Sequence, residues 1–218
     1  LGSISLNSTQ QLYSYAQFAD ANGNSLPLYM YNKDYTDTIG QGKLLDWKYY
    51  PLEDWKHNST STSLHDMVAN FGLRYKLTAD LNIDIKYQYE WQQISSEGLK
   101  DIQSFYTRDL INGFSVIDYS SQNLIYNIPM GGILEKTLTT LQSKNFRTQL
   151  NYSKTWGRSR VAAIFGNEIR DVENNSGYDR LYGYNPDLLT VANADYINYY
   201  PTLIPGYYQN IKGGPGVS

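Results

Sequence analysis

Aromatic side chains gather in two segments of the chain, and they are the residues whose chemistry could recognise a ligand. They are Trp47, Tyr49, Tyr50 and Trp55 in the first segment, and Tyr178, Tyr182 and Tyr184 in the second. An aromatic ring can stack on a sugar ring, which buries apolar area and leaves a polar tip free to form a hydrogen bond. The same side chains could instead pack the loops together or contact a partner protein. Both interpretations are consistent with the sequence.

Residue patterns typical of catalysis are missing from the sequence. Glu53 and Asp54 are adjacent in an expected loop without a partner base, and there is no nucleophile elbow, phosphate-binding loop or dinucleotide motif. The chain has no cysteine and only two histidines, His57 and His65, which we expect to be solvated among Ser, Thr and Asn. We therefore expect no enzyme activity, no cofactor and no metal site.

Composition narrows the class of protein further. Charged residues make up 18% of the 218 residues and the net charge is −3, so the chain has no basic field for nucleic acid. No stretch approaches the roughly 20 apolar residues that a transmembrane helix needs. The 22 tyrosines favour strands, because tyrosine has a high β-propensity and suits a surface that is apolar at one end and wet at the other.

Strict alternation of apolar and polar residues identifies the elements that would position these aromatic residues. In 81–92 the odd positions are all apolar or aromatic, from Leu81 to Trp91, and the even positions are all polar. Residues 67–77 alternate in the same way, and 78–80 form a short polar connection. A period of two residues over this length predicts strands with one dry and one wet face, joined as a hairpin.

A second hairpin follows the same pattern less cleanly. Residues 146–156 and 161–169 alternate around a turn at 157–159, with Lys154 and Asn167 interrupting the apolar face and Ile164 lying on the polar one. We place the two hairpins at 65–94 and 145–172. The long loops are expected at 32–63, 95–144 and 173–218, with a short amphipathic helix within 99–114.

The lengths of strands and connections predict an all-β fold of a particular kind. The alternating runs approach the 9–11 residues of a tilted transmembrane strand, about twice the length usual in globular proteins. Short turns alternate with long loops, as in outer-membrane barrels, where periplasmic turns are short and extracellular loops are long. We therefore expect an antiparallel transmembrane β-barrel segment with long extracellular loops, and an incomplete barrel.

Several strings in the chain resemble the barrel of SusC/RagA-type TonB-dependent transporters. They are LDW with PLE in 45–53, SFYTRDLIN in 104–112, IPMGGIL in 128–134, NFRTQLNYSKTW in 145–156 and AIFGNEIR in 163–170. The resemblance covers about residues 15–184, and the order and spacing of the strings are more specific than any one of them. It implies a barrel of about 22 strands with a plugged lumen, of which this chain is a middle section.

The resemblance also implies a function and partners. It implies import of oligosaccharides or peptides across the outer membrane of a Gram-negative cell, powered through the TonB system, with a SusD-like surface lipoprotein as a lid. One strand face would then contact outer-membrane lipid and the long loops would form a substrate vestibule. The residues expected to face the lumen or the plug are Arg74, Lys86, Glu90, Arg147, Glu168 and Arg170.

Two other interpretations remain open at this point. A soluble β-sandwich that binds carbohydrate would show alternation and exposed aromatic residues too, although with shorter strands. A passive porin would share the physics of the barrel but lack a plug. No signal peptide, plug or closing strand is recognisable, so we expect the chain to be an internal piece of a longer protein.

Overall fold

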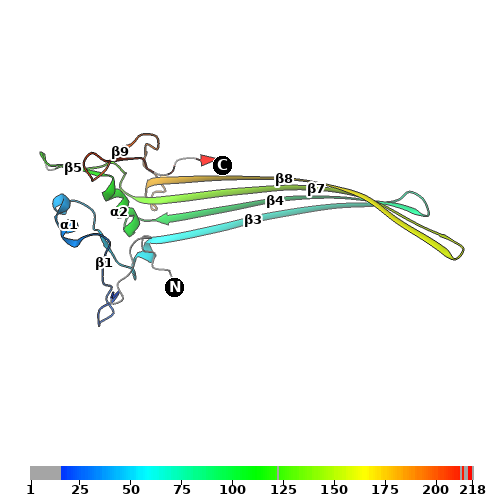
Figure 1. The fold of residues 1–218 in the computed structure, drawn as a ribbon, viewed down its shortest axis with the longest axis horizontal. Coiled ribbons are helices and arrows are strands. Elements are labelled where there is room, and N and C mark those ends of the chain that lie inside the picture. The colour runs from blue at the N-terminus through cyan, green and yellow to red at the C-terminus, as the bar shows by residue number, and fades with distance from the viewer. Residues whose placement is uncertain (1–15, 122, 212, 214–215, 218) are drawn as a thin grey trace. The chain divides into compact units, whose positions relative to one another are not determined.

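The computed structural model describes residues 16–121, 123–211, 213 and 216–217, and of the last two it describes the backbone alone. In chain order the elements are β1 (Leu28–Tyr29), α1 (Lys33–Thr38), η1 (Ile39–Gly42), β2 (Lys48–Tyr49), η2 (Asp54–His57), β3 (Asn58–Lys76), β4 (Leu81–Lys100), α2 (Phe105–Gly113), β5 (Ser115–Asp118), β6 (Asn123–Tyr126), β7 (Gly132–Trp156), β8 (Ser159–Tyr184), β9 (Tyr200–Pro201), β10 (Tyr208–Gln209) and β11 (Gly216–Val217) (Figure 1). Most described residues lie in antiparallel strands, so the prediction of an all-β fold is confirmed.

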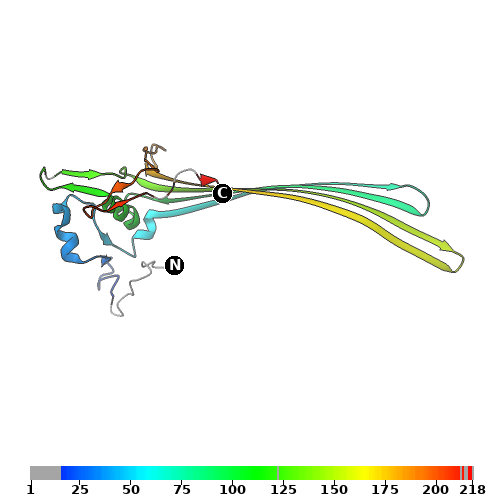
Figure 2. The ribbon, with the colours of Figure 1, turned by 45° about the horizontal axis from the view of Figure 1, so that its top comes forward.

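One sheet contains all the long strands. Its strand order is β11-β8-β7-β4-β3, and β3, β4, β7 and β8 lie side by side in both views (Figures 1 and 2). The sheet is open within the described residues, with β3 and β11 at its edges. Three small two-stranded sheets pair β1 with β2, β5 with β6 and β9 with β10. No helix in the part of the chain that the structure describes is long and apolar enough to cross a membrane.

Both predicted short turns are present. Between β3 and β4, the amides of Leu77 and Thr78 donate to the carbonyl oxygen of Leu81, at 2.9 and 3.1 Å. Between β7 and β8 the connection is Gly157-Arg158, and Gly157 has a φ of +55°. A glycine with positive φ at the first position of a two-residue turn matches the right-handed twist of the paired strands, which fixes the register of this hairpin.

The long strands extend well beyond their expected ends. The hairpins predicted at 65–94 and 145–172 occupy Asn58–Lys100 and Gly132–Tyr184, so the long loops are shorter than expected. In the added length the backbones still pair, and hydroxyl side chains bridge neighbouring strands at Thr62–Ser96 (3.0 Å) and Thr139–Ser176 (3.1 Å). Backbone pairing needs no apolar face, so it continues where the alternation that predicted the strands has ended.

The chain divides into two compact units. The strand unit consists of Thr62–Ser96, Thr137–Gly177 and Val217–Ser218, and the loop unit consists of Leu1–Ser61, Glu97–Lys136 and Tyr178–Gly216. The loop unit has a hydrophobic core in which Ile111 and Phe114 pack with Ile128, Ile133 and Tyr182. Ile111 belongs to α2, so the amphipathic helix expected within 99–114 is confirmed over nine residues.

The strand unit has two chemically different faces. On one face Asp84 accepts hydrogen bonds from Arg74 and from Asn151 (2.7 Å), and Gln149 donates to Asn151 (2.6 Å). These contacts join three strands, so they show that the polar residues of the alternating runs share a face. The residues that alternate with these polar residues point to the opposite face of the sheet. They include many large exposed hydrophobics: Met67, Phe71, Leu73, Tyr75, Tyr87, Phe146, Trp156, Val161, Phe165 and Ile169.

Candidate functional site

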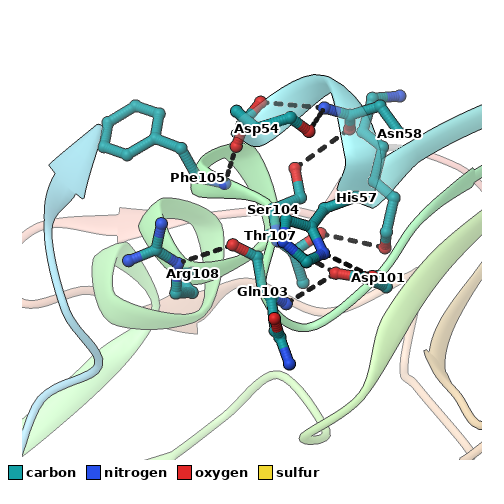
Figure 3. Close-up of polar contacts among 10 residues, drawn as sticks. Asp54, His57, Asn58, Asp101, Gln103, Ser104, Phe105, Thr107 and Arg108 are labelled. Carbon is teal, nitrogen blue, oxygen red and sulfur yellow. Dashed lines mark hydrogen bonds and ion pairs between the residues drawn. The ribbon is translucent and has the colours of Figure 1, made fainter. Parts of the chain in front are cut away.

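The N-terminus of α2 is held by two carboxylates from different segments of the loop unit (Figure 3). Asp101 Oδ1 accepts the amides of Gln103 (2.7 Å) and Ser104 (3.1 Å), and Asp54 Oδ1 accepts the amide of Phe105 (2.6 Å). The first amides of a helix have no partner within it and carry partial positive charge, so carboxylates stabilise them. Asp54 thereby fixes η2 beside the start of α2.

His57 is bound to the same cap. Its Nδ1 lies 2.9 Å from Asp101 Oδ2, and its side chain is only 26% exposed, so the expectation that His57 is solvated was wrong. The hydroxyl of Ser104 donates to Asn58 Oδ1 (3.0 Å) and not to the histidine. Ser104, His57 and Asp101 therefore do not form the Ser-His-Asp relay of a hydrolase, because the Ser104 hydroxyl donates to Asn58. His65, in contrast, is exposed.

Arg108 ties α2 to the segment that carries the first aromatic cluster. Its Nε donates to the carbonyl of Gln103 (3.0 Å), and its two Nη atoms donate to the carbonyls of Asp46 and Lys48. The side chain is 14% exposed. All three guanidinium nitrogens are thus used on backbone carbonyls, and Nη1 also lies 3.7 Å from Asp46 Oδ2, so Arg108 is a structural clamp with a paired charge.

A hollow of about 360 Å³ opens in this region of the loop unit. It is lined by Tyr50, Glu53, Asp54, His57, Gln103 and Arg108, together with Ile102. We call it the polar hollow. A second hollow of about 260 Å³ lies between η1 and the β5–β6 hairpin, where Tyr35 and Tyr119 contribute to its lining.

Three of the predicted aromatic contacts are buried and cannot meet a ligand at the surface. Trp47 is 9% exposed and stacks on Tyr35 with ring centroids 6.1 Å apart. Tyr49 is 8% exposed against Phe105, and Tyr182 is 1% exposed in the core of the loop unit. For these residues the alternative interpretation, packing of the loops, is correct. Each buries a large apolar ring, which contributes more to folding than a solvated position would.

The other predicted aromatic residues stay accessible. Trp55 is 63% exposed, and its indole nitrogen donates to the carbonyl of Leu52 (2.9 Å), which holds the ring in one orientation. Tyr50 is half-buried and lines the polar hollow. Tyr178 is 41% exposed and donates to Glu135 (3.2 Å), while Tyr184 is half-buried. The structure places Tyr50 and Trp55 on the same short segment, five residues apart.

The predicted lumen-facing residues lie in the strand unit and differ in their contacts. Arg74 pairs with Asp84, Arg147 donates to Gln149 (3.0 Å), and Glu168 accepts from Asn145 (2.8 Å). The side chains of three others form no hydrogen bond or ion pair within the described part of the chain: Lys86, Glu90 and Arg170. Five of the six belong to the alternating runs and Arg170 directly follows the last one on β8, and the contacts of the first three lie on the polar face.

A cluster of charged and aromatic residues forms a second polar centre in the loop unit. Glu135 accepts from Lys100 (3.0 Å) and Tyr178, and its Oε1 lies 3.6 Å from Arg180 Nε. The guanidinium of Arg180 lies over the rings of Tyr106 (5.3 Å) and Tyr182 (5.5 Å). Burial alone would raise the pKa of Glu135, but Lys100 and then Arg180 outweigh it and hold the pKa below its ordinary value.

This balance predicts a pH dependence for Glu135→Gln. A carboxylate with a lowered pKa contributes stability above its unfolded pKa, and loses it as the pH falls through the folded pKa. We expect the variant to lower the free energy of unfolding by about 1 kcal/mol at pH 7. The difference should close below the ordinary pKa of 4.5. Chemical denaturation of both proteins across pH 3–7 would measure it.

Glu97→Gln is the matched control for this prediction. Glu97 also pairs with a lysine, Lys136 at 2.8 Å, but the two side chains are 50% and 44% exposed. An exposed pair of this kind contributes less than about 0.5 kcal/mol, so the control should change little at any pH. A Glu135→Gln deficit that persists unchanged at pH 3 would contradict the charge-based explanation.

Comparison with known proteins adds no family to this description. No protein-family model matches the chain, and no curated protein matches it.

Proposed function

We propose that the chain is a section of the β-barrel of an outer-membrane transporter of the TonB-dependent kind, importing oligosaccharides or peptides with a SusD-like lipoprotein over its mouth. The observation that carries the proposal is an apolar band on one face of the strand unit. The band comprises the alternating runs 67–77, 81–91, 146–156 and 161–169, which all lie next to the two short turns.

The dimensions of the band fit a bilayer. About 11 residues at about 3.3 Å per residue, tilted by about 45°, rise about 25 Å, which is the height of the apolar band on outer-membrane barrels. The exposed large hydrophobics of the band, with Phe165 at 73% and Phe71 at 62%, have no protein covering them within the described residues. Lipid would cover them, because a contiguous apolar surface of this size is rarely left in water.

The opposite face supports the same proposal. Its hydrogen-bonded carboxylate, amide and guanidinium groups suit a wet lumen or the surface of a plug. The strands continue beyond the apolar band into the loop unit, where β3 begins at Asn58 and β8 ends at Tyr184. In a transporter we expect the accessible aromatic residues to belong to the extracellular loops, where a substrate arrives.

Trp55→Ala in the full-length transporter tests the part of the proposal that concerns substrate. Trp55 is the most exposed of the predicted aromatic contacts, and stacking on one aromatic ring contributes about 0.5–1.5 kcal/mol. We expect affinity for the transported substrate to fall about threefold to tenfold, measured as uptake of labelled substrate at low concentration.

Two other tryptophans serve as controls. Trp156→Ala, at the turn end of β7, should leave affinity unchanged. Trp47→Ala should instead lower stability by about 3 kcal/mol, because it removes a buried ring. Unchanged uptake by Trp55→Ala would remove the aromatic segment from the substrate path.

A further inference from the structure

The polar hollow presents hydrogen-bonding groups that the protein does not use. His57 Nδ1 is bound to Asp101, and its Nε2 has no hydrogen-bond partner within the described residues. The side chains of Gln103 and Tyr50 also form no hydrogen bond there, although the backbone of both residues does. His57 and Tyr50 are half-buried, where a group without a partner is costly unless water or a ligand satisfies it, and Gln103 is exposed. All three groups are therefore available to a ligand.

The side chains that line the hollow are held in position by hydrogen bonds to neighbouring residues. Asp101 orients the imidazole, and the same carboxylate accepts the amides of Gln103 and Ser104 just before α2, so the position of Nε2 is fixed before a ligand arrives. Asp54 is fixed by the amide of Phe105 and by Asn58 Nδ2 (2.8 Å). A site assembled in advance loses less conformational entropy when it binds.

The charges around the hollow disfavour an anionic ligand. The arginine in its lining, Arg108, donates to the carbonyls of Gln103, Asp46 and Lys48, and its charge is balanced by the Asp46 carboxylate, 3.7 Å from Nη1. Glu53 and Asp54 contribute two carboxylates, and the nearby Lys56 is bound to Glu53. Glu53 is balanced by Lys56, whereas Asp54 accepts only from neutral donors, the amide of Phe105 and Asn58 Nδ2. An incoming carboxylate or sulfate would therefore meet the uncompensated charge of Asp54, which disfavours it by Coulomb repulsion.

The remaining chemistry fits a sugar ring. Imidazole nitrogen, amide, phenol and carboxylate can each bond a hydroxyl group, and the ring of Tyr50 adds an apolar surface. A volume of about 360 Å³ lies near the lower end of ligand-pocket sizes, about 300–1,000 Å³, and therefore suits one small unit of a chain.

We propose that the polar hollow binds one neutral or amino-sugar unit of an oligosaccharide and rejects acidic sugars. The assignment to an oligosaccharide rests on the proposed transport function, which leaves oligosaccharides and peptides open. The charge selectivity follows from Glu53, Asp54 and the committed Arg108. Trp55, on η2 beside Glu53 and His57, is placed to stack on a neighbouring unit of the same chain.

The test uses the full-length protein extracted from outer membranes in detergent, with calorimetric titration of defined probes. The probes are neutral chitohexaose, its deacetylated amino-sugar form, hexagalacturonate and its neutral methyl ester, and a library of uncharged hexapeptides. Hexagalacturonate and its methyl ester differ mainly in charge. We expect a neutral or amino-sugar probe to bind about tenfold or more tightly than hexagalacturonate.

Three substitutions assign the binding to the hollow. Gln103→Ala removes an amide without a protein partner, and His57→Asn keeps a donor for Asp101 while deleting Nε2; each should weaken sugar binding about threefold to tenfold. Glu53→Gln removes one negative charge and releases Lys56, so affinity for hexagalacturonate should rise. Tyr119→Ala, in the second hollow, is the matched control and should bind as wild type.

The outcomes separate this inference from the transport proposal. Binding of hexapeptides alone, preference for hexagalacturonate, binding of none of the sugars, or wild-type affinity in both Gln103→Ala and His57→Asn would each overturn the sugar assignment. The transport proposal would stand through all of these, since it depends on recovery of the protein in the outer membrane. Absence of the protein from that membrane would overturn the transport proposal, whatever sugar it binds.

Discussion

Phe71→Arg is expected to prevent the full-length protein from assembling in the outer membrane. Phe71 is 62% exposed and lies near the middle of the apolar band on β3. At the midplane of a bilayer, an arginine on the lipid face costs about 2–4 kcal/mol, and the cost falls towards the membrane surface. Cell fractionation and the heat-modified electrophoretic mobility typical of folded barrels would measure assembly. Phe165→Arg on β8, where the phenylalanine is 73% exposed, should have the same effect.

Asn70→Arg is the matched control, one residue away on the same strand. Successive residues of a strand point to opposite faces, so Asn70 lies on the polar face with Arg74. An arginine there would face water or a plug, and assembly should remain close to wild type. If Phe71→Arg and Asn70→Arg both assemble as wild type does, the apolar band does not meet lipid. A soluble carbohydrate-binding sheet would then become the better interpretation of the chain.

The sequence predicts the two hairpins because their chemistry is local and periodic. From Leu81 to Trp91 the alternation is unbroken, and the turn at 157–159 has the glycine that its backbone requires. The outer parts of the strands escape prediction because apolar and polar residues do not alternate regularly in them, as in the Ile133-Leu134-Glu135 stretch of β7. Thr62 and Ser96 pair across the sheet at 3.0 Å, but nothing in their own neighbourhoods marks them as strand.

The candidate site was less predictable, because its contacts join residues far apart in the chain. His57 and Asp101 are 44 residues apart, so no local motif could have paired them. Ser104, directly before Phe105, does carry a local helix-start signal, because serine is a preferred N-cap residue. The aromatic clusters were visible as clusters, but burial depends on tertiary neighbours. Trp47 packs on Tyr31 and Tyr35, whereas Trp55 remains exposed.

Replacement of Arg180 with alanine should have the largest effect on stability in the loop unit. Arg180 is 6% exposed, pairs with Glu135, donates to the hydroxyl of Tyr106 and lies over the ring of Tyr182. Removing one member of a buried ionic network leaves desolvated partners behind and costs about 3 kcal/mol. Loss of contact with the two aromatic rings adds to that cost. Hydrogen exchange of the full-length protein would localise the effect to β7 and β8 near these residues.

Arg147→Ala separates this effect from the general loss of an arginine. Arg147 is exposed and donates only to Gln149, so its removal should change stability by less than about 0.5 kcal/mol. Arg180→Lys is the more discriminating variant, because lysine keeps the charge but lacks the guanidinium that lies over the rings of Tyr106 and Tyr182. If lysine restores wild-type exchange rates, charge neutralisation of Glu135 is sufficient. If lysine does not restore them, the contacts of the guanidinium with the two rings are needed to order the second aromatic segment, including Tyr178 at its hydrogen bond to Glu135.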